Sequence, residues 1–103
     1  MIKFVNNNIS IVRGDTGILP INFSQEVDSA VFSVKKNIED TEYVLQKNIT
    51  DGVLQFDHED TNDLDAGKYV YDIQVNYNNN VETPIIAYFT VIADVTREWL
   101  IWI

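Results

Sequence analysis

The chain contains no cysteine, and this absence excludes several kinds of chemistry at once. No disulfide can support the fold, no thiolate can bind zinc, and no cysteine nucleophile is available. The only histidine is His58, so a zinc or iron site is not expected either. The four glycines are scattered and form no phosphate-binding loop. The lack of cysteine fits folding in a reducing cytoplasm, although some secreted bacterial and viral β-proteins also lack it.

Basic residues are scarce as well, with 7 lysines and arginines against 16 acidic residues and a net charge of −9. This balance disfavours binding to phosphate backbones and to anionic membranes, so we expect neither partner. The acidity is typical of a solvated surface, but it would also suit mimicry of nucleic acid or docking onto a basic partner. No apolar run approaches the ~20 residues of a membrane span. The N-terminal segment turns polar after Val5, so no signal peptide is expected.

Apolar residues are abundant, at 46% of 103 residues, which suits one globular domain with a single two-layer core. The longest clean alternation of apolar and polar residues is Lys68–Tyr77, and it follows a polar, turn-prone loop that begins at Asp60. Val70 is the only apolar residue on the polar face of this stretch, and period-2 alternation of this kind predicts a half-buried strand. The residues expected on the buried face are Tyr69, Tyr71, Ile73, Val75 and Tyr77.

Further short strands are predicted along the rest of the chain, and no window shows helical periodicity over more than one turn. Pro20 indicates an edge strand or a bulge. Asn78–Asn80 predicts a turn, and Thr50–Gly52 predicts a tight hairpin joining strands at Glu42–Ile49 and Val53–Asp57. The final strand, Val81–Ala93, is apolar on both faces and is expected to be covered on both. Expected inward positions are Ile9, Ile11, Leu19, Ile21, Phe23, Ala30, Phe32, Val34, Tyr43, Leu45, Ile49, Leu54 and Phe56.

These patterns predict an all-β, antiparallel sandwich of seven to eight strands. We assign residues 1–97 to this domain and residues 98–103 to an apolar C-terminal tail or final strand. The order Asp65-x-Gly67-x-Tyr69-x-Tyr71 resembles the corner before strand F of immunoglobulin-type sandwiches. The resemblance implies that the Tyr69 hydroxyl returns to the backbone of the preceding acidic loop. Without cysteine, and without tryptophan in the middle strands, the domain is immunoglobulin-like in architecture only.

A wider resemblance covers about residues 9 to 96. Its motifs are a Gly14-Asp15 turn, an F-S-V-K-K segment, the hairpin Ile49–Phe56, the acidic segment Asp60–Ile73 and the closing segment Phe89–Arg97. The chain resembles the small immunoglobulin-like proteins and N-terminal modules encoded in tail and baseplate gene clusters of phages and prophages of Gram-positive bacteria. The N-terminal module of the baseplate upper protein is one such relative. The resemblance supplies no catalytic residues.

The acidic loop at Asp57–Asp65 is the densest group of potential metal ligands. It begins like a calcium loop, but Leu64 stands where an oxygen ligand belongs and Asp65 where a glycine belongs. A solvated connection between strands is the preferred interpretation. No nucleophile elbow supports a Ser–His–Asp site at His58. We therefore predict no catalytic residue, no metal and no cofactor. The tripeptide Arg13-Gly14-Asp15 is interpreted as a turn and not as an integrin motif.

The last five residues form the most apolar segment of the chain. If exposed, they would be an aggregation hazard, so we expect them to be buried. They could pack on their own domain or anchor in a partner, since buried tryptophans are frequent interface hot spots. The predicted partner-binding residues are Trp99, Leu100, Ile101, Trp102 and Ile103.

Together these observations favour a non-enzymatic virion component of a phage or prophage tail or baseplate. It would act through contacts with virion subunits or with itself, and would reside in the host cytoplasm before assembly. Two alternatives remain open at this point. One is a small acidic phage-encoded inhibitor that binds a basic surface of a host protein, and the other is a module that binds glycans on the host surface.

Overall fold

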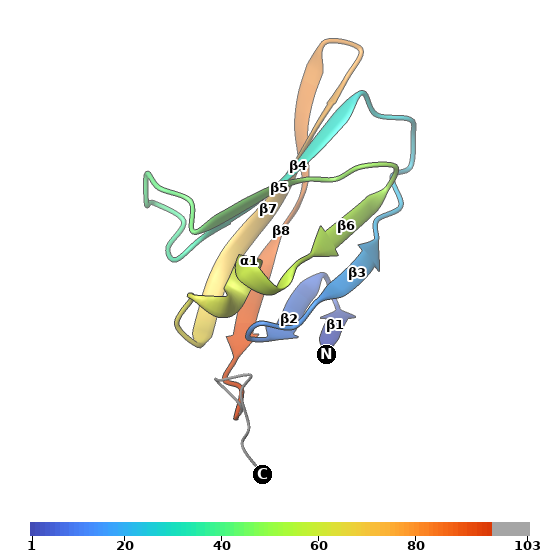
Figure 1. The fold of residues 1–103 in the computed structure, drawn as a ribbon. Coiled ribbons are helices and arrows are strands. Elements are labelled where there is room, and N and C mark those ends of the chain that lie inside the picture. The colour runs from blue at the N-terminus through green and yellow to red at the C-terminus, as the bar shows by residue number, and fades with distance from the viewer. Residues whose placement is uncertain (96–103) are drawn as a thin grey trace.

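The computed structural model describes residues 1–95 as an all-β fold with one short helix (Figure 1). The all-β class predicted from the sequence is confirmed. The predicted partner-binding segment Trp99–Ile103 lies outside the described residues. Within residues 1–95, no helix is long and apolar enough to cross a lipid bilayer. The elements are β1 (Ile2–Val5), β2 (Asn8–Val12), β3 (Gly17–Pro20), β4 (Ser29–Lys35), β5 (Leu45–Asn48), β6 (Val53–Phe56), α1 (His58–Asn62), β7 (Gly67–Tyr77) and β8 (Asn80–Ile92).

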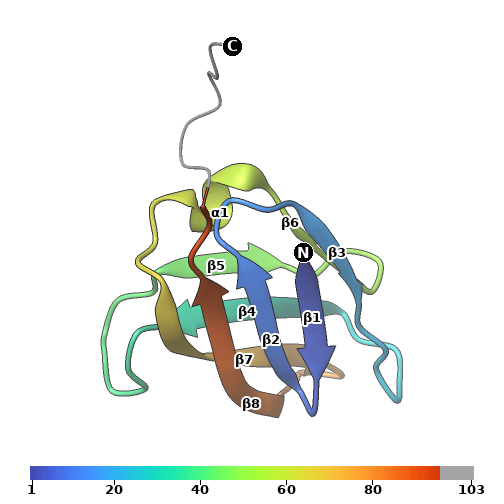
Figure 2. The ribbon, with the colours of Figure 1, turned by 90° about the horizontal axis from the view of Figure 1, so that it is seen from below.

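The strands form two sheets that enclose the core between them (Figure 2). One sheet has six strands in the order β1-β2-β8-β7-β4-β5, and the other pairs β3 with β6. The prediction of a purely antiparallel sandwich was wrong at one place, because β2 runs parallel to β8, with Ile9 opposite Phe89. Parallel pairing needs a long connection, and here β3 to β7 and α1 all lie between the two strands. Local sequence patterns cannot reveal a pairing of this kind.

Three tight turns have the backbone expected from their sequences. Both central residues have positive φ in the turns at Asn6-Asn7, Asp51-Gly52 and Asn78-Asn79. Two consecutive positive φ values are what a type I′ hairpin turn requires, and Asn, Asp and Gly tolerate them best. The first turn joins β1 and β2 into an antiparallel hairpin, and the third joins β7 and β8.

The hairpin predicted between Glu42–Ile49 and Val53–Asp57 is only one bridge long, at Thr50 and Val53. Beyond this bridge the two arms separate, because β5 pairs with β4 in the large sheet and β6 pairs with β3 in the small one. The prediction of a paired hairpin was therefore wrong. The turn was read correctly, but it carries the chain from one sheet to the other.

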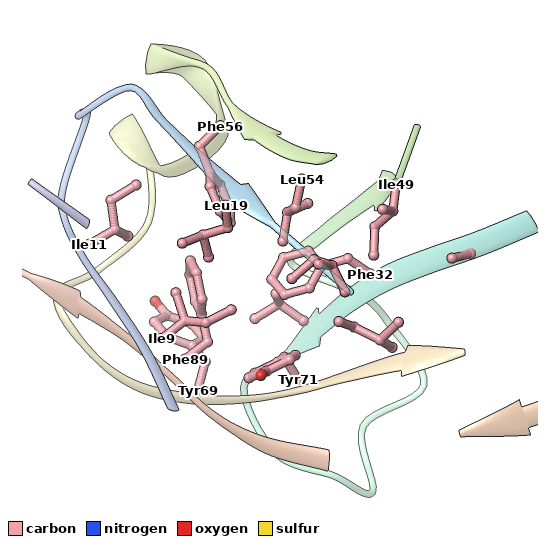
Figure 3. Close-up of a cluster of buried hydrophobic side chains, with 14 of the residues drawn as sticks. Ile9, Ile11, Leu19, Phe32, Ile49, Leu54, Phe56, Tyr69, Tyr71 and Phe89 are labelled. Atoms are coloured by element: carbon pink, nitrogen blue, oxygen red, sulfur yellow. The ribbon is translucent and has the colours of Figure 1, made fainter. Parts of the chain in front are cut away.

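Side chains from both sheets meet in one hydrophobic core (Figure 3). Phe56, from the small sheet, lies with its ring centroid 5.6 Å from Phe32 and 5.8 Å from Phe89, both from the large sheet. Such aromatic pairs add stabilisation beyond the area they bury, and here they join the two layers. Most of the predicted inward positions are buried, with Phe23, Leu45 and Tyr77 partly buried at the margins.

Two burial predictions were wrong. Tyr43 is 52% exposed because β5 begins only at Leu45, so the residues before it follow the surface. The final strand β8 is covered on one face only, since Ile86 and Tyr88 are 63% and 48% exposed. Both exceptions fall on the same side of the large sheet.

Candidate interaction surface

The predicted corner residues lie together at the start of β7. The Tyr69 hydroxyl donates a hydrogen bond to the backbone carbonyl of Asp65 over 2.6 Å. Gly67 has φ of +148°, a conformation that L side chains rarely adopt, and it lets the chain turn into the strand. Burial raises the pKa of Tyr69, the nearby Asp65 carboxylate raises it further, and Arg13 lowers it. This arrangement fixes the entry of the chain into β7.

The carboxylates of the acidic loop serve local structure. The Asp60 carboxylate accepts a hydrogen bond from the backbone N–H of Asp57, the N-cap of α1, over 2.7 Å. Lys47, from β5, lies 2.5 Å from the same carboxylate and 3.6 Å from that of Asp57. Among residues 1–95, no three His, Asp or Glu side chains are grouped so that they could hold a metal ion.

The turn at Arg13–Asp15 is also occupied with structural contacts. Gly14 has φ of +83°, and Arg13 Nε donates to the Asp94 carboxylate over 2.9 Å. The Asp15 carboxylate forms an ion pair with the N-terminal amine of Met1. These contacts tie the turn to Met1, which precedes β1, and to Asp94, which follows β8.

The surface with the strongest signs of interaction is the solvent side of β4, β7 and β8, which we call the outer face. Strand register places Val70 opposite Tyr88, and Asp72 opposite Ile86. Ile38 and Tyr43, from the connection between β4 and β5, extend this surface at its margin, and they are 65% and 52% exposed. Two adjoining recesses share Ile38 and Val70 in their walls. The outer face comprises Ser33, Lys35, Ile38, Tyr43, Lys68, Val70, Asp72, Ile86 and Tyr88.

Lysines lie over both exposed tyrosine rings of the outer face. Lys35 Nζ is 5.1 Å from the ring centroid of Tyr43, and Lys68 Nζ is 4.5 Å from that of Tyr88. Such cation–π contacts are worth about 0.5–1 kcal/mol each at exposed sites, and they favour one orientation of each ring. The outer face therefore presents ordered aromatic and aliphatic groups with two cations among them, in a chain that is otherwise strongly acidic.

A single carboxylate, that of Asp72, lies within this apolar surface. It is half-buried and lines a recess together with Ile38, Tyr43 and Ile86. Burial raises the pKa of Asp72, and the charge of Lys35 partly opposes that shift. A carboxylate that is partly desolvated by neighbouring apolar groups is suited to a directed polar contact with a partner.

Sequence reasoning missed the outer face because its residues come from four separate segments. The signal that could have revealed it was present in β8, where Ile86, Tyr88 and Ile92 are apolar on the face opposite Phe89 and Val91. We interpreted that pattern as burial on both sides. The chain matches no protein-family model and no curated protein sequence.

Proposed function

We propose that the chain is a non-enzymatic structural protein of a phage or prophage virion, placed in the tail or baseplate, and that it works through protein–protein contacts. The observation that carries this proposal is the exposed apolar outer face of the six-stranded sheet. It supports the part of the proposal that concerns contact with protein. The phage assignment rests on the sequence resemblance over residues 9 to 96.

A sheet with one face in water normally alternates apolar-in and polar-out. The outer face breaks that rule at Ile86 and Tyr88, on neighbouring positions of the same side of β8. Contiguous apolar surface rimmed by polar groups is a sign of an interaction site. Tyrosine is also enriched in protein interfaces, because one end of its ring is apolar and the other can stay hydrated.

We further propose that the sandwich is of the immunoglobulin-like type. The pairing of β3 with β6 opposite a sheet in which β4, β7 and β8 are neighbours supports this assignment. The hydrogen bond from Tyr69 to the Asp65 carbonyl at the entry to β7 supports it as well.

The C-terminal segment Trp99–Ile103 is proposed as a second contact with a neighbouring subunit or a second copy. The protein would then be held in the virion by two surfaces, and it would be found in the host cytoplasm before assembly. The variants below are designed on the outer face, where the contacts and exposure of each residue are described.

Mass spectrometry of particles purified from the phage or lysogen that encodes the chain tests the proposal. We expect the protein at a fixed copy number per particle. A double variant, Ile86→Ser with Tyr88→Ser, should be lost from particles, whereas Ile18→Ser, an equally exposed apolar position on β3, should be retained. Absence of the wild-type protein from particles, or incorporation of the double variant at the wild-type level, would overturn it.

A further inference from the structure

A second surface lies at the end of the sandwich opposite α1, where the β3–β4 connection and the β5–β6 turn run side by side (Figure 1). A groove is formed there by residues 21–23, 25–30 and 48–52. Its apolar lining includes the buried Ile21, Ala30 and Ile49 and the partly buried Phe23 and Val27. This groove lies outside the outer face and shares no residue with it.

Backbone hydrogen bonds fix the walls of the groove. The N–H of Ile21 donates to the carbonyl of Gly52 over 2.7 Å, and the N–H of Ile49 donates to the carbonyl of Ala30 over 2.9 Å. At the far end, the N–H of Asp28 donates to the carbonyl of Asn76 over 2.7 Å. The groove is therefore held in shape by contacts that need no ligand, which reduces the entropic cost of filling it.

The charge of the groove is of one sign. Glu26, Asp28 and Asp51 are exposed, and the lining residues include no lysine, arginine or histidine. None of these three carboxylates belongs to an ion pair within residues 1–95. By contrast, Asp57 and Asp60 of the acidic loop share Lys47. The groove thus combines an apolar floor with a rim of negative charge that has no cation of its own to balance it.

We propose that this groove binds an extended segment of another protein in which lysine or arginine alternates with aliphatic side chains. In an extended chain, successive side chains point to opposite sides, so the apolar ones can enter the floor while neighbouring cations reach the rim. Charge complementarity of this kind favours encounter and selects against acidic partners. The inference is independent of the outer face, so the two contacts can succeed or fail separately.

The test measures binding of a fluorescein-labelled seven-residue peptide in which lysine alternates with valine, by fluorescence anisotropy against the full chain. The groove variant carries Glu26→Gln, Asp28→Asn and Asp51→Asn. The matched control carries Glu59→Gln, Asp63→Asn and Asp65→Asn, which changes the net charge by the same amount at the opposite end of the molecule. Thermal unfolding of each variant verifies that the fold is retained.

We expect the groove variant to bind the peptide at least tenfold more weakly than the wild type, a change of about 1.4 kcal/mol in binding free energy. The matched control should bind within about twofold of the wild type. A floor variant, Val27→Ser, leaves the charge unchanged and should also weaken binding. Equal weakening in the groove variant and the matched control would show only general attraction to an acidic protein and would overturn the proposal. Failure of the wild-type chain to bind the peptide would overturn it too, without bearing on incorporation into particles.

Discussion

The hydroxyl oxygen of Thr61 accepts a hydrogen bond from the backbone N–H of Gly14 over 2.8 Å, and Thr61 is completely buried. Beside it, the Nδ1 atom of His58 lies 2.7 Å from the Gly14 carbonyl. Two side chains of α1 thus contact the backbone of a turn that lies 44 and 47 positions earlier in the chain. The acidic loop, whose charges first suggest a metal site, is better understood as the connection that fastens α1 to the β2–β3 turn.

Replacing Thr61 by valine should therefore destabilise the fold although the shape of the side chain is kept. The variant removes the only acceptor described for the Gly14 N–H. An unpaired donor costs about 1–3 kcal/mol when fully buried, and Gly14 is partly buried, so we expect a loss towards the lower end of that range. Urea unfolding measures the change. Thr61→Ser, which keeps the oxygen and loses one methyl group, should cost less than Thr61→Val, and the reverse order would contradict this role for the hydroxyl.

Alkaline stability should depend on Tyr71. Its hydroxyl donates to the Asn7 carbonyl, and burial raises its pKa from 10.0 to about 12. The unfolded chain releases this proton near pH 10, whereas the folded chain keeps it to about pH 12. The contribution of Tyr71 to the free energy of unfolding is thus full below pH 10 and is lost as the pH rises through about 12.

The variant Tyr71→Phe should consequently show a shallower fall in the free energy of unfolding between pH 9 and pH 11 than the wild type. At neutral pH it should lose about 1 kcal/mol through the missing hydrogen bond. Urea unfolding at several pH values checks both effects. Identical slopes for the two proteins would show that Tyr71 is not held protonated by the fold.

Asp72 should make the stability of the isolated protein depend on pH in the acid range. Because burial raises its pKa above the ordinary 3.8, its contribution to stability is present at acid pH and is lost as the pH rises through the folded pKa. The free energy of unfolding of Asp72→Asn, minus that of the wild type, should therefore be more positive at pH 7 than at pH 3. A difference that grows more negative towards pH 7 would mean that Lys35 outweighs the burial and stabilises the anion.

Much of the fold followed from local patterns in the sequence. Alternation identified the inner positions of β4, β6 and β7, because a half-buried strand needs that period whatever it pairs with. The asparagine turns were equally readable, since few residues tolerate consecutive positive φ. Pairing was harder. Nothing local indicates that β2 runs beside β8, or that the arms flanking Asp51-Gly52 belong to different sheets.

The candidate surfaces were less predictable than the fold. The outer face depends on which side of β8 meets the core, and the apolar residues Ile86 and Tyr88 made that strand look buried on both sides. The groove depends on two loops that approach each other only in three dimensions. The composition shows an excess of acidic residues. It does not show which carboxylates lie at the groove and which ones contact the start of α1.

The central claim is that protein covers the outer face in the working assembly. Hydroxyl-radical footprinting compares the isolated chain with the same chain in purified particles, and mass spectrometry reads the oxidation of each side chain. We predict strong protection of Tyr43 and Tyr88 in particles, while Ile18 on β3, which is somewhat more exposed than either tyrosine, stays reactive. Equal oxidation of Tyr43 and Tyr88 in both states would contradict the claim.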